Sequence, residues 1–164
     1  MNVQRELLVA VALAFAGCDS QDLDAGEAAR LSEPHLSSFV RFDAWARRAL
    51  GSDPGFRTNE AREETIFAPI RMDNAVVGAW VEHAANSEAW QLNDVALPAG
   101  ELDWVPLRDE RLGKIRVATS RMSRPGAEQD RTSSCVLIER TASVSPNHLV
   151  RVVAAYALPG TEGS

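Results

Sequence analysis

Histidine and cysteine side chains are the usual ligands of metal centres, and this chain has few of either. No two of its three histidines are spaced as in the H-x-x-x-H or H-E-x-x-H motifs of zinc enzymes. Its two cysteines are too far apart in the sequence to form a C-x-x-C pair. These residues are His35, His83, His148, Cys18 and Cys135. We therefore predict no metal centre and no bound cofactor.

The nucleophiles and carboxylates also lack a catalytic pattern. The chain contains no G-x-S-x-G, S-x-x-K, Walker or G-x-G-x-x-G motif. Two charged runs, Glu60–Glu64 and Arg108–Arg111, mix both signs and are typical of solvated surfaces. A glycosidase pair of Asp and Glu depends on a distance in space, which the sequence does not contain. We predict no catalytic residue, and a hydrolase with an unrecognised site is the alternative.

The second cysteine and the tryptophans are predicted to be structural. Cys135 opens the apolar run Cys135–Ile138, where a small hydrophobic residue is normally buried and unreactive. Trp is often found in protein cores, although it also lines ligand clefts. We therefore expect a mainly buried position for the four tryptophans, Trp45, Trp80, Trp90 and Trp104.

The composition is that of an acidic, soluble globular domain. The 164 residues are 45% hydrophobic and 24% charged, with a formal net charge of −6. This length is enough for one domain with a substantial core. All basic residues except Lys114 are arginines, and they are scattered rather than clustered. An acidic chain without a basic patch is a poor candidate for binding nucleic acid.

The first residues have the features of an export signal. Leu7–Phe15 is a run of nine apolar residues, which is shorter than the roughly 20 that a membrane-spanning helix needs. Ala16 and Gly17 are small, and Cys18 follows them. Ala14–Ala16 also forms an A-x-A signal, so ordinary cleavage before Gly17 is an alternative. Another alternative to an export signal is that this segment forms a buried helix of a cytosolic protein.

The stretch Phe15-Ala16-Gly17-Cys18 resembles the lipobox of bacterial lipoproteins. The resemblance implies that residues 1–17 are a signal peptide and that Cys18 becomes the acylated first residue, carrying fatty acids such as palmitate. Several acyl chains give stable membrane anchoring. Residues 18–26 would then form an acidic tether, in which the eight residues after the cysteine reach at most about 28 Å. The implied location is the bacterial cell envelope, with the choice of inner or outer membrane left open.

The N-terminal half of the domain is predicted to be helical. Glu27–Leu31 fits one or two helical turns, and Ser32 is placed to cap a longer helix that has Pro34 in its first turn. Apolar residues recur at helical spacing as far as Leu50, and Gly51 is expected to end this helix. A short helix is expected from Thr58 or Asn59 to Glu64.

The rest of the domain is predicted to be strands. Ile66–Ile70 and Ala75–Val81 flank Asp73-Asn74 and favour a hairpin, although residues 75–85 also fit a helix. Five further apolar runs are separated by turn residues: Trp90–Leu97, Leu102–Leu107, Lys114–Met122, Cys135–Val144 and His148–Leu158. The first two of these flank a turn, and the last two are expected to form a central hairpin.

These elements predict the α+β class, with N-terminal helices packed on an antiparallel sheet of about six strands. One domain is expected over residues 27–159, with a flexible tail at 160–164.

The segment of residues 66–81 is similar to a hairpin of Cache and GAF sensor domains. The similarity lies in Ala68-Pro69-Ile70, Asp73-Asn74 and Val76–Ala79. In those families the hairpin belongs to a sheet that floors a small-molecule pocket, so the resemblance implies such a pocket here.

Taken together, the sequence favours an envelope-anchored lipoprotein without enzymatic activity. Its partners would be the membrane, through the lipid, and a small molecule or another protein in the envelope. The alternatives are a membrane-tethered hydrolase and a purely structural envelope component.

Overall fold

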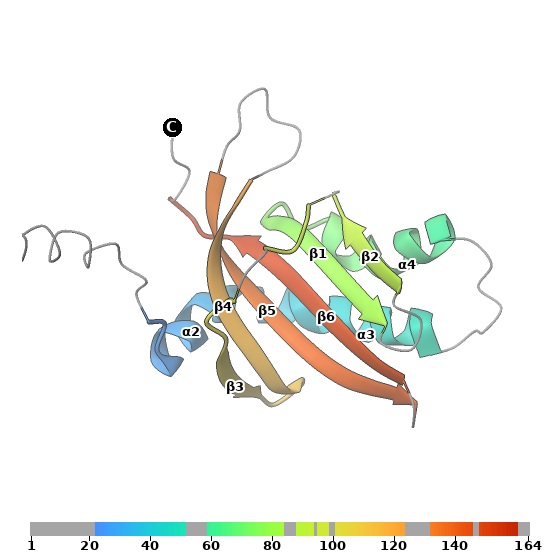
Figure 1. Cartoon of the computed structure of the whole chain (residues 1–164), viewed down its shortest axis with the longest axis horizontal. Helices are drawn as coiled ribbons and strands as arrows, with labels where there is room; N and C mark the ends of the chain where they lie inside the picture. The colour runs from blue at the N-terminus through green and yellow to red at the C-terminus, as the bar shows by residue number, and fades with distance from the viewer. Residues whose placement is uncertain are drawn as a thin grey trace, which may run out of the picture.

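The computed structural model describes residues 22–51, 59–83, 88–93, 95–98, 101–123, 132–145 and 148–160. The helical elements come first along the chain: α2 (Ala25–Ser32), the 3-10 turn η1 (Glu33–His35), α3 (Leu36–Gly51) and α4 (Asn59–Arg71). The strands follow: β1 (Val76–His83), β2 (Glu88–Leu92), β3 (Val105–Asp109), β4 (Gly113–Ser123), β5 (Thr132–Ser145) and β6 (His148–Ala157). Figure 1 shows this order from blue to red.

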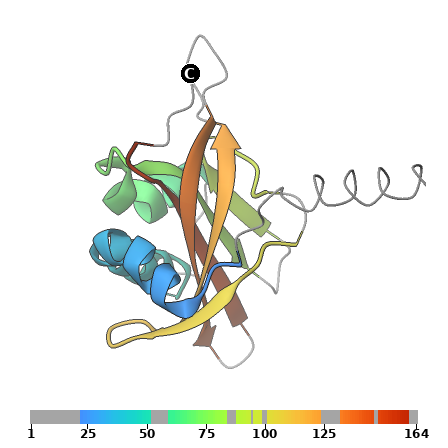
Figure 2. The same cartoon turned by 90° about the vertical axis from the view of Figure 1, so that its left-hand side faces the viewer.

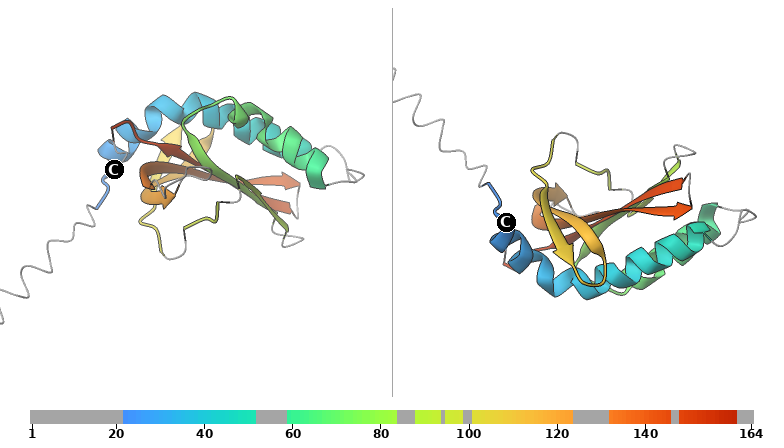
Figure 3. Two further views of the ribbon diagram at one scale, coloured as in Figure 1. Left: turned by 90° about the horizontal axis from the view of Figure 1, so that it is seen from above. Right: turned by 90° about the horizontal axis from the view of Figure 1, so that it is seen from below.

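The strands form one antiparallel sheet of six, in the order β2-β1-β6-β5-β4-β3. Figures 2 and 3 show that the helices all lie against the same face of this sheet. We call this the helical face, and we call the opposite face the second face. The predicted α+β architecture, with N-terminal helices on an antiparallel sheet, is confirmed.

The N-terminal helices are joined more closely than the sequence predicts. α2, η1 and α3 follow one another without a gap, and Ser32 does not cap a helix. Its hydroxyl instead donates to the carbonyl of Ala28 at 2.8 Å. Asp24 is the N-cap of α2, because its carboxylate accepts from the backbone N–H of Glu27 at 2.8 Å. Pro34 lies in the 3-10 turn, where its missing N–H costs least.

The predicted strand at residues 66–70 is wrong, because this segment belongs to α4. Ile66 and Ile70 lie one turn apart, which puts both on the buried side of the helix. Asp73 makes the turn from helix to strand by accepting from the backbone N–H of Ala75 at 2.9 Å. β1 then shows that the following residues form a strand rather than a helix. The hairpin expected from the resemblance to Cache and GAF domains is therefore absent from residues 66–81.

The runs Trp90–Leu97 and Leu102–Leu107, which flank the expected turn, do not pair with each other. Among the residues that the structure describes, β2 pairs only with β1 and β3 pairs only with β4, so these two strands lie at opposite edges of the sheet. The chain between them crosses the second face. We call its described residues, 95–98 and 101–104, the roof. Apolar side chains of the roof pack on the sheet, which explains why this segment looked like strand in the sequence.

The expected central hairpin is confirmed. β5 and β6 are the two central strands, with Ile138 opposite Ala154 and Val136 opposite Tyr156. β6 is not apolar on both faces along its whole length, because Leu149 near its start is 52% exposed.

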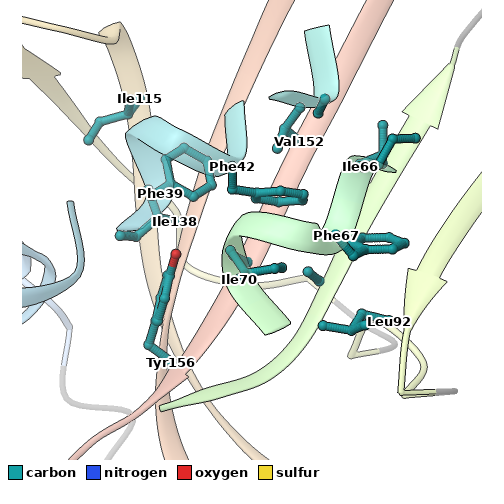
Figure 4. Close-up of a cluster of buried hydrophobic side chains, with 14 of the residues drawn as sticks. Phe39, Phe42, Ile66, Phe67, Ile70, Leu92, Ile115, Ile138, Val152 and Tyr156 are labelled. Atoms are coloured by element: carbon teal, nitrogen blue, oxygen red, sulfur yellow. The ribbon is translucent and has the colours of Figure 1, made fainter. Parts of the chain in front are cut away.

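The core of the helical face is built from aromatic and aliphatic side chains, as Figure 4 shows. Phe42 of α3 stacks on Phe67 of α4 with ring centroids 5.9 Å apart. Below them lie Ile138 of β5 and Tyr156 of β6, both fully buried. Packing against one continuous sheet face therefore holds α3 and α4 in place.

A smaller apolar cluster lies on the second face under the roof. Trp80 is its largest member, and its indole N–H donates to the carbonyl of Val95 in the roof at 2.7 Å. Gly78 is required beside it, because a Cβ there would lie 2.8 Å from the Trp80 ring. Cys135 belongs to this cluster and is completely buried, so its predicted burial is confirmed.

The two faces of the central hairpin predict opposite outcomes for one kind of substitution. Ile138→Asp would bury an unpaired carboxylate among apolar side chains of the helical face and should cost more than about 4 kcal/mol of unfolding free energy. Leu149→Asp places the same group on a half-exposed position of the neighbouring strand and should cost less than about 1 kcal/mol. Urea denaturation of both variants measures the difference. Equal midpoints would contradict the assigned register.

Candidate functional site

The second face becomes polar beyond the apolar cluster. Register places charged side chains side by side on this part of the sheet. Arg116 of β4 lies opposite Glu139 of β5. On the other side of β5, Arg151 of β6 lies opposite Glu82 of β1. A continuous charged row thus crosses four strands of the sheet.

Glu139 is the centre of this row. Its carboxylate is buried, with a side-chain exposure of 2%. Oε1 lies 2.6 Å from Nε and 2.5 Å from Nη2 of Arg116. Oε2 lies 2.7 Å from Nε and 2.6 Å from Nη2 of Arg151. Each carboxylate oxygen thus receives two N–H groups from one guanidinium, which is a strong charge-assisted arrangement.

Arg151 extends the row to β1. Its Nη1 lies 3.1 Å from Oε2 of Glu82. Burial alone would lower the pKa of Arg151, but its hydrogen bonds and charge interactions with Glu139 and Glu82 raise that pKa above the ordinary value. This side chain therefore stays charged, and its hydrogen bonds go to Glu139 and Glu82.

An open groove of about 780 Å³ lies over β3, β4 and β5. Its size falls in the range of roughly 300–1,000 Å³ that is usual for small-molecule sites. Side chains of the second face line it, among them Pro106, Arg108, Lys114, Arg116, Glu139 and Thr141. The groove thus combines three cations with one carboxylate, although the whole chain has a formal charge of −6.

A tight turn between β3 and β4 joins the two strands that carry Arg108 and Lys114. Asp109 accepts from the backbone N–H groups of Arg111 and Leu112 at 2.8 and 3.0 Å. Burial alone would raise the pKa of Asp109, but these hydrogen bonds and the Arg111 side chain lower it below its ordinary value. Gly113 completes the turn with a φ of 73°, which favours glycine. The turn sets Arg108 directly opposite Lys114.

Arg108 and Lys114 are both exposed, and neither side chain forms an ion pair or hydrogen bond within the part of the chain that the structure describes. Arg116 is held more firmly than either. Besides Glu139, it contacts Trp104 at the end of the roof, whose ring centroid lies 5.1 Å from the guanidinium carbon. The groove is therefore bounded on one side by a fixed guanidinium and on the other by two cations without a counter-charge.

A second charged cluster lies on the helical face, away from the groove. Asp43 of α3 is completely buried, and its Oδ2 lies 2.5 Å from Nη1 of Arg140 in β5 and 2.7 Å from Nη2 of Arg47. Oδ1 of Asp43 has no hydrogen-bond partner among the described residues. These contacts join α3 to the centre of the sheet, so the cluster has a structural role.

His35 and Tyr156 form a third polar contact, where η1 meets the sheet. Their rings stack with centroids 4.6 Å apart. Burial lowers the pKa of His35 below its ordinary value of 6.5, although the charge of Asp73 opposes this. Burial also raises the pKa of Tyr156, whose hydroxyl lies 3.4 Å from Oγ of Ser38. Both rings are therefore neutral at pH 7 and act as packing groups.

The residues singled out in the sequence do not meet at the groove. Cys18 lies outside the described residues, as do the side chains of His148 and Glu60. His83 is buried on the helical face. Among the described residues no three His, Cys, Asp or Glu side chains are grouped so that they could hold a metal ion.

The tryptophans divide between core and surface. Trp80 and Trp90 are buried as expected, Trp104 is partly buried at the groove, and Trp45 is 40% exposed. The expectation of a mainly buried position thus holds for two of the four and is wrong for Trp45. Sequence reasoning also assigned Arg108 to a solvated run and missed its position at the groove.

Comparisons with protein-family models, curated proteins and solved structures find no match for this chain. Within the described residues, no helix is long and apolar enough to cross a membrane.

The buried ion pairs of Glu139 predict a stability difference between two carboxylates of the same face. Glu139→Gln would leave Arg116 without a counter-charge and Arg151 with Glu82 alone, and it should lower the unfolding free energy by about 2–3 kcal/mol. Glu82 makes one contact and its side chain is 42% exposed, so Glu82→Gln should cost less than about 1 kcal/mol. Urea titrations of both variants give the comparison. A smaller effect at Glu139 than at Glu82 would refute its central position.

The lowered pKa of His35 predicts a specific loss of stability in acid. Above pH 6.5 the imidazole is neutral in both the folded and the unfolded chain, so its contribution is complete. As the pH falls through 6.5, the unfolded chain takes up a proton that the folded chain resists, and stability falls until the folded pKa is passed. Between about pH 7.5 and about pH 5, the parent should therefore lose more stability than His35→Gln. Parallel losses in the two proteins would show that His35 titrates normally.

Proposed function

We propose that this chain is a lipoprotein of the bacterial cell envelope, anchored through Cys18, whose α+β domain binds a small molecule without catalysing a reaction. The anchor rests on the sequence: the apolar run Leu7–Phe15 followed by Ala16, Gly17 and Cys18. The first described residue, Asp22, lies only a few positions after Cys18, so the domain would be held close to the membrane surface.

The binding role rests on one observation, the groove over β3, β4 and β5. Its volume of about 780 Å³ suits a small organic molecule. Its floor is the regular sheet, and Glu139 fixes the guanidinium of Arg116 there before any ligand arrives. A site that is fixed in advance loses little conformational entropy on binding.

The same groove favours binding over hydrolysis. Its lining residues include no His, Cys or Ser, and the one carboxylate among them is Glu139. Both oxygens of Glu139 are engaged with guanidiniums, so this carboxylate is poorly placed to act as a general base or a nucleophile. A ligand-binding module is thus the simplest role for the described residues.

The anchor predicts the outcome of fatty-acid labelling. When the chain is expressed in a bacterial host with radioactive palmitate, the parent should become labelled and Cys18→Ser should not. Cys135→Ser is the matched control, because Cys135 is buried in the domain and should not affect labelling. Equal labelling of the parent and Cys18→Ser would refute the lipoprotein assignment. Loss of label in Cys135→Ser alone would refute it as well.

A further inference from the structure

We propose that the groove binds a phosphate group, through Arg108, Lys114 and the outer edge of the Arg116 guanidinium. This inference rests on the proposed function and gives the chemical class of the ligand. The phosphate monoester would belong either to a soluble compound or to a lipid headgroup such as that of phosphatidic acid, since the recognised chemistry is the same.

The first argument is the lack of a counter-charge at the groove. Like charges that face each other across two antiparallel strands destabilise a sheet, and Arg108 faces Lys114 in this way. In the part of the chain that the structure describes, neither contacts a carboxylate. Several other arginines of the described residues do have acidic partners: Arg30, Arg47, Arg111, Arg116, Arg140 and Arg151. An anion in the groove would remove this repulsion.

The second argument is the way in which Arg116 is held. Glu139 contacts Nε and Nη2 of this guanidinium, while Nη1 has no hydrogen bond or ion pair among the described residues. The Arg116 side chain is 49% exposed, so its outer edge is accessible to a ligand. Glu139 is thus a positioning residue, because it fixes the guanidinium plane and leaves part of its donor set available. Guanidinium groups bind phosphate and carboxylate oxygens through paired N–H donors.

The third argument is the amount of charge to be balanced. The groove lining holds three cations against one carboxylate, which leaves two positive charges. A phosphate monoester carries roughly −1.5 to −2 at pH 7, whereas a carboxylate carries only one negative charge. A phosphate group therefore matches the excess more closely. The hydroxyl of Thr141, also in the lining, could donate a further hydrogen bond to a phosphate oxygen.

The fourth argument is the space that remains. The groove is much larger than a phosphate group, so it leaves room for an organic substituent beside Pro106. A soluble ester and a lipid headgroup both meet this requirement. The short acidic tether expected after Cys18 would bring the groove within reach of headgroups, which makes the second source worth a separate arm of the test.

Isothermal titration calorimetry of the purified full-length chain in detergent tests the proposal. The probes are glycerol 3-phosphate, soluble dihexanoyl phosphatidic acid, and glycerol as the neutral control. We expect saturable binding of at least one phosphate probe and none of glycerol. Lys114→Gln and Arg108→Gln should each weaken that binding by about tenfold, because each removes a charge-assisted contact. Both side chains are exposed and unpaired among the described residues, so folding should be retained in the variants.

Arg71→Gln is the matched control. It removes the same charge from an exposed position in α4, on the helical side of the sheet, and should leave binding unchanged. Failure of both phosphate probes to bind the parent would overturn the proposal. An equal affinity of the parent, Lys114→Gln and Arg108→Gln would also overturn it, and so would an equal loss in Arg71→Gln.

The remaining outcomes separate this inference from the proposed function. Binding of the lipid probe alone, lost in the groove variants, supports a headgroup as the source of the phosphate. Binding of glycerol 3-phosphate supports a soluble ester. If neither binds but an uncharged or cationic compound does, and Thr141→Trp abolishes that binding, the groove is a ligand site and the phosphate assignment is wrong. A labelling experiment that shows no acylation of Cys18 would refute the lipid anchor, but it would not contradict the phosphate site.

Discussion

The second face of the sheet depends on a single buried carboxylate. Glu139 lies on β5, an inner strand, where a charged side chain is normally costly. It is tolerated because guanidiniums from both neighbouring strands supply four N–H contacts to it. Without this carboxylate, Arg116 on β4 and Arg151 on β6 would lie on either side of β5 with no shared counter-charge. One ion-pair network thus permits a polar surface in the middle of an otherwise apolar sheet.

This network also marks the boundary between two kinds of surface. On one side, the roof covers an apolar cluster around Trp80 and Leu137. On the other side, the sheet is open and carries the groove. Trp104 lies where the two meet, because it packs against the apolar cluster and contacts Arg116. The helical face carries most of the core, so the open part of the second face can differ in sequence without loss of the fold.

The sequence predicted the elements whose partners are close along the chain. The β5–β6 hairpin follows from apolar runs on both sides of a short turn, and the helix ending at Gly51 follows from its periodicity. Ile66–Ile70 was assigned wrongly because its apolar residues fit both a strand and a helix face. The groove was beyond prediction, since Arg116, Glu139 and Arg151 look like ordinary surface residues of three strands. Only the pairing register brings them together.

The connection from β2 to β3 joins the two outermost strands and crosses the whole width of the second face. Its length therefore determines how much of the second face is covered. A longer connection would extend past Trp104 and deepen the groove, and a shorter one would narrow the covered part of the sheet. Neither change touches a residue of the helical core. The size of the covered region can therefore change by insertion and deletion in one segment, while the aromatic packing under α3 and α4 stays constant.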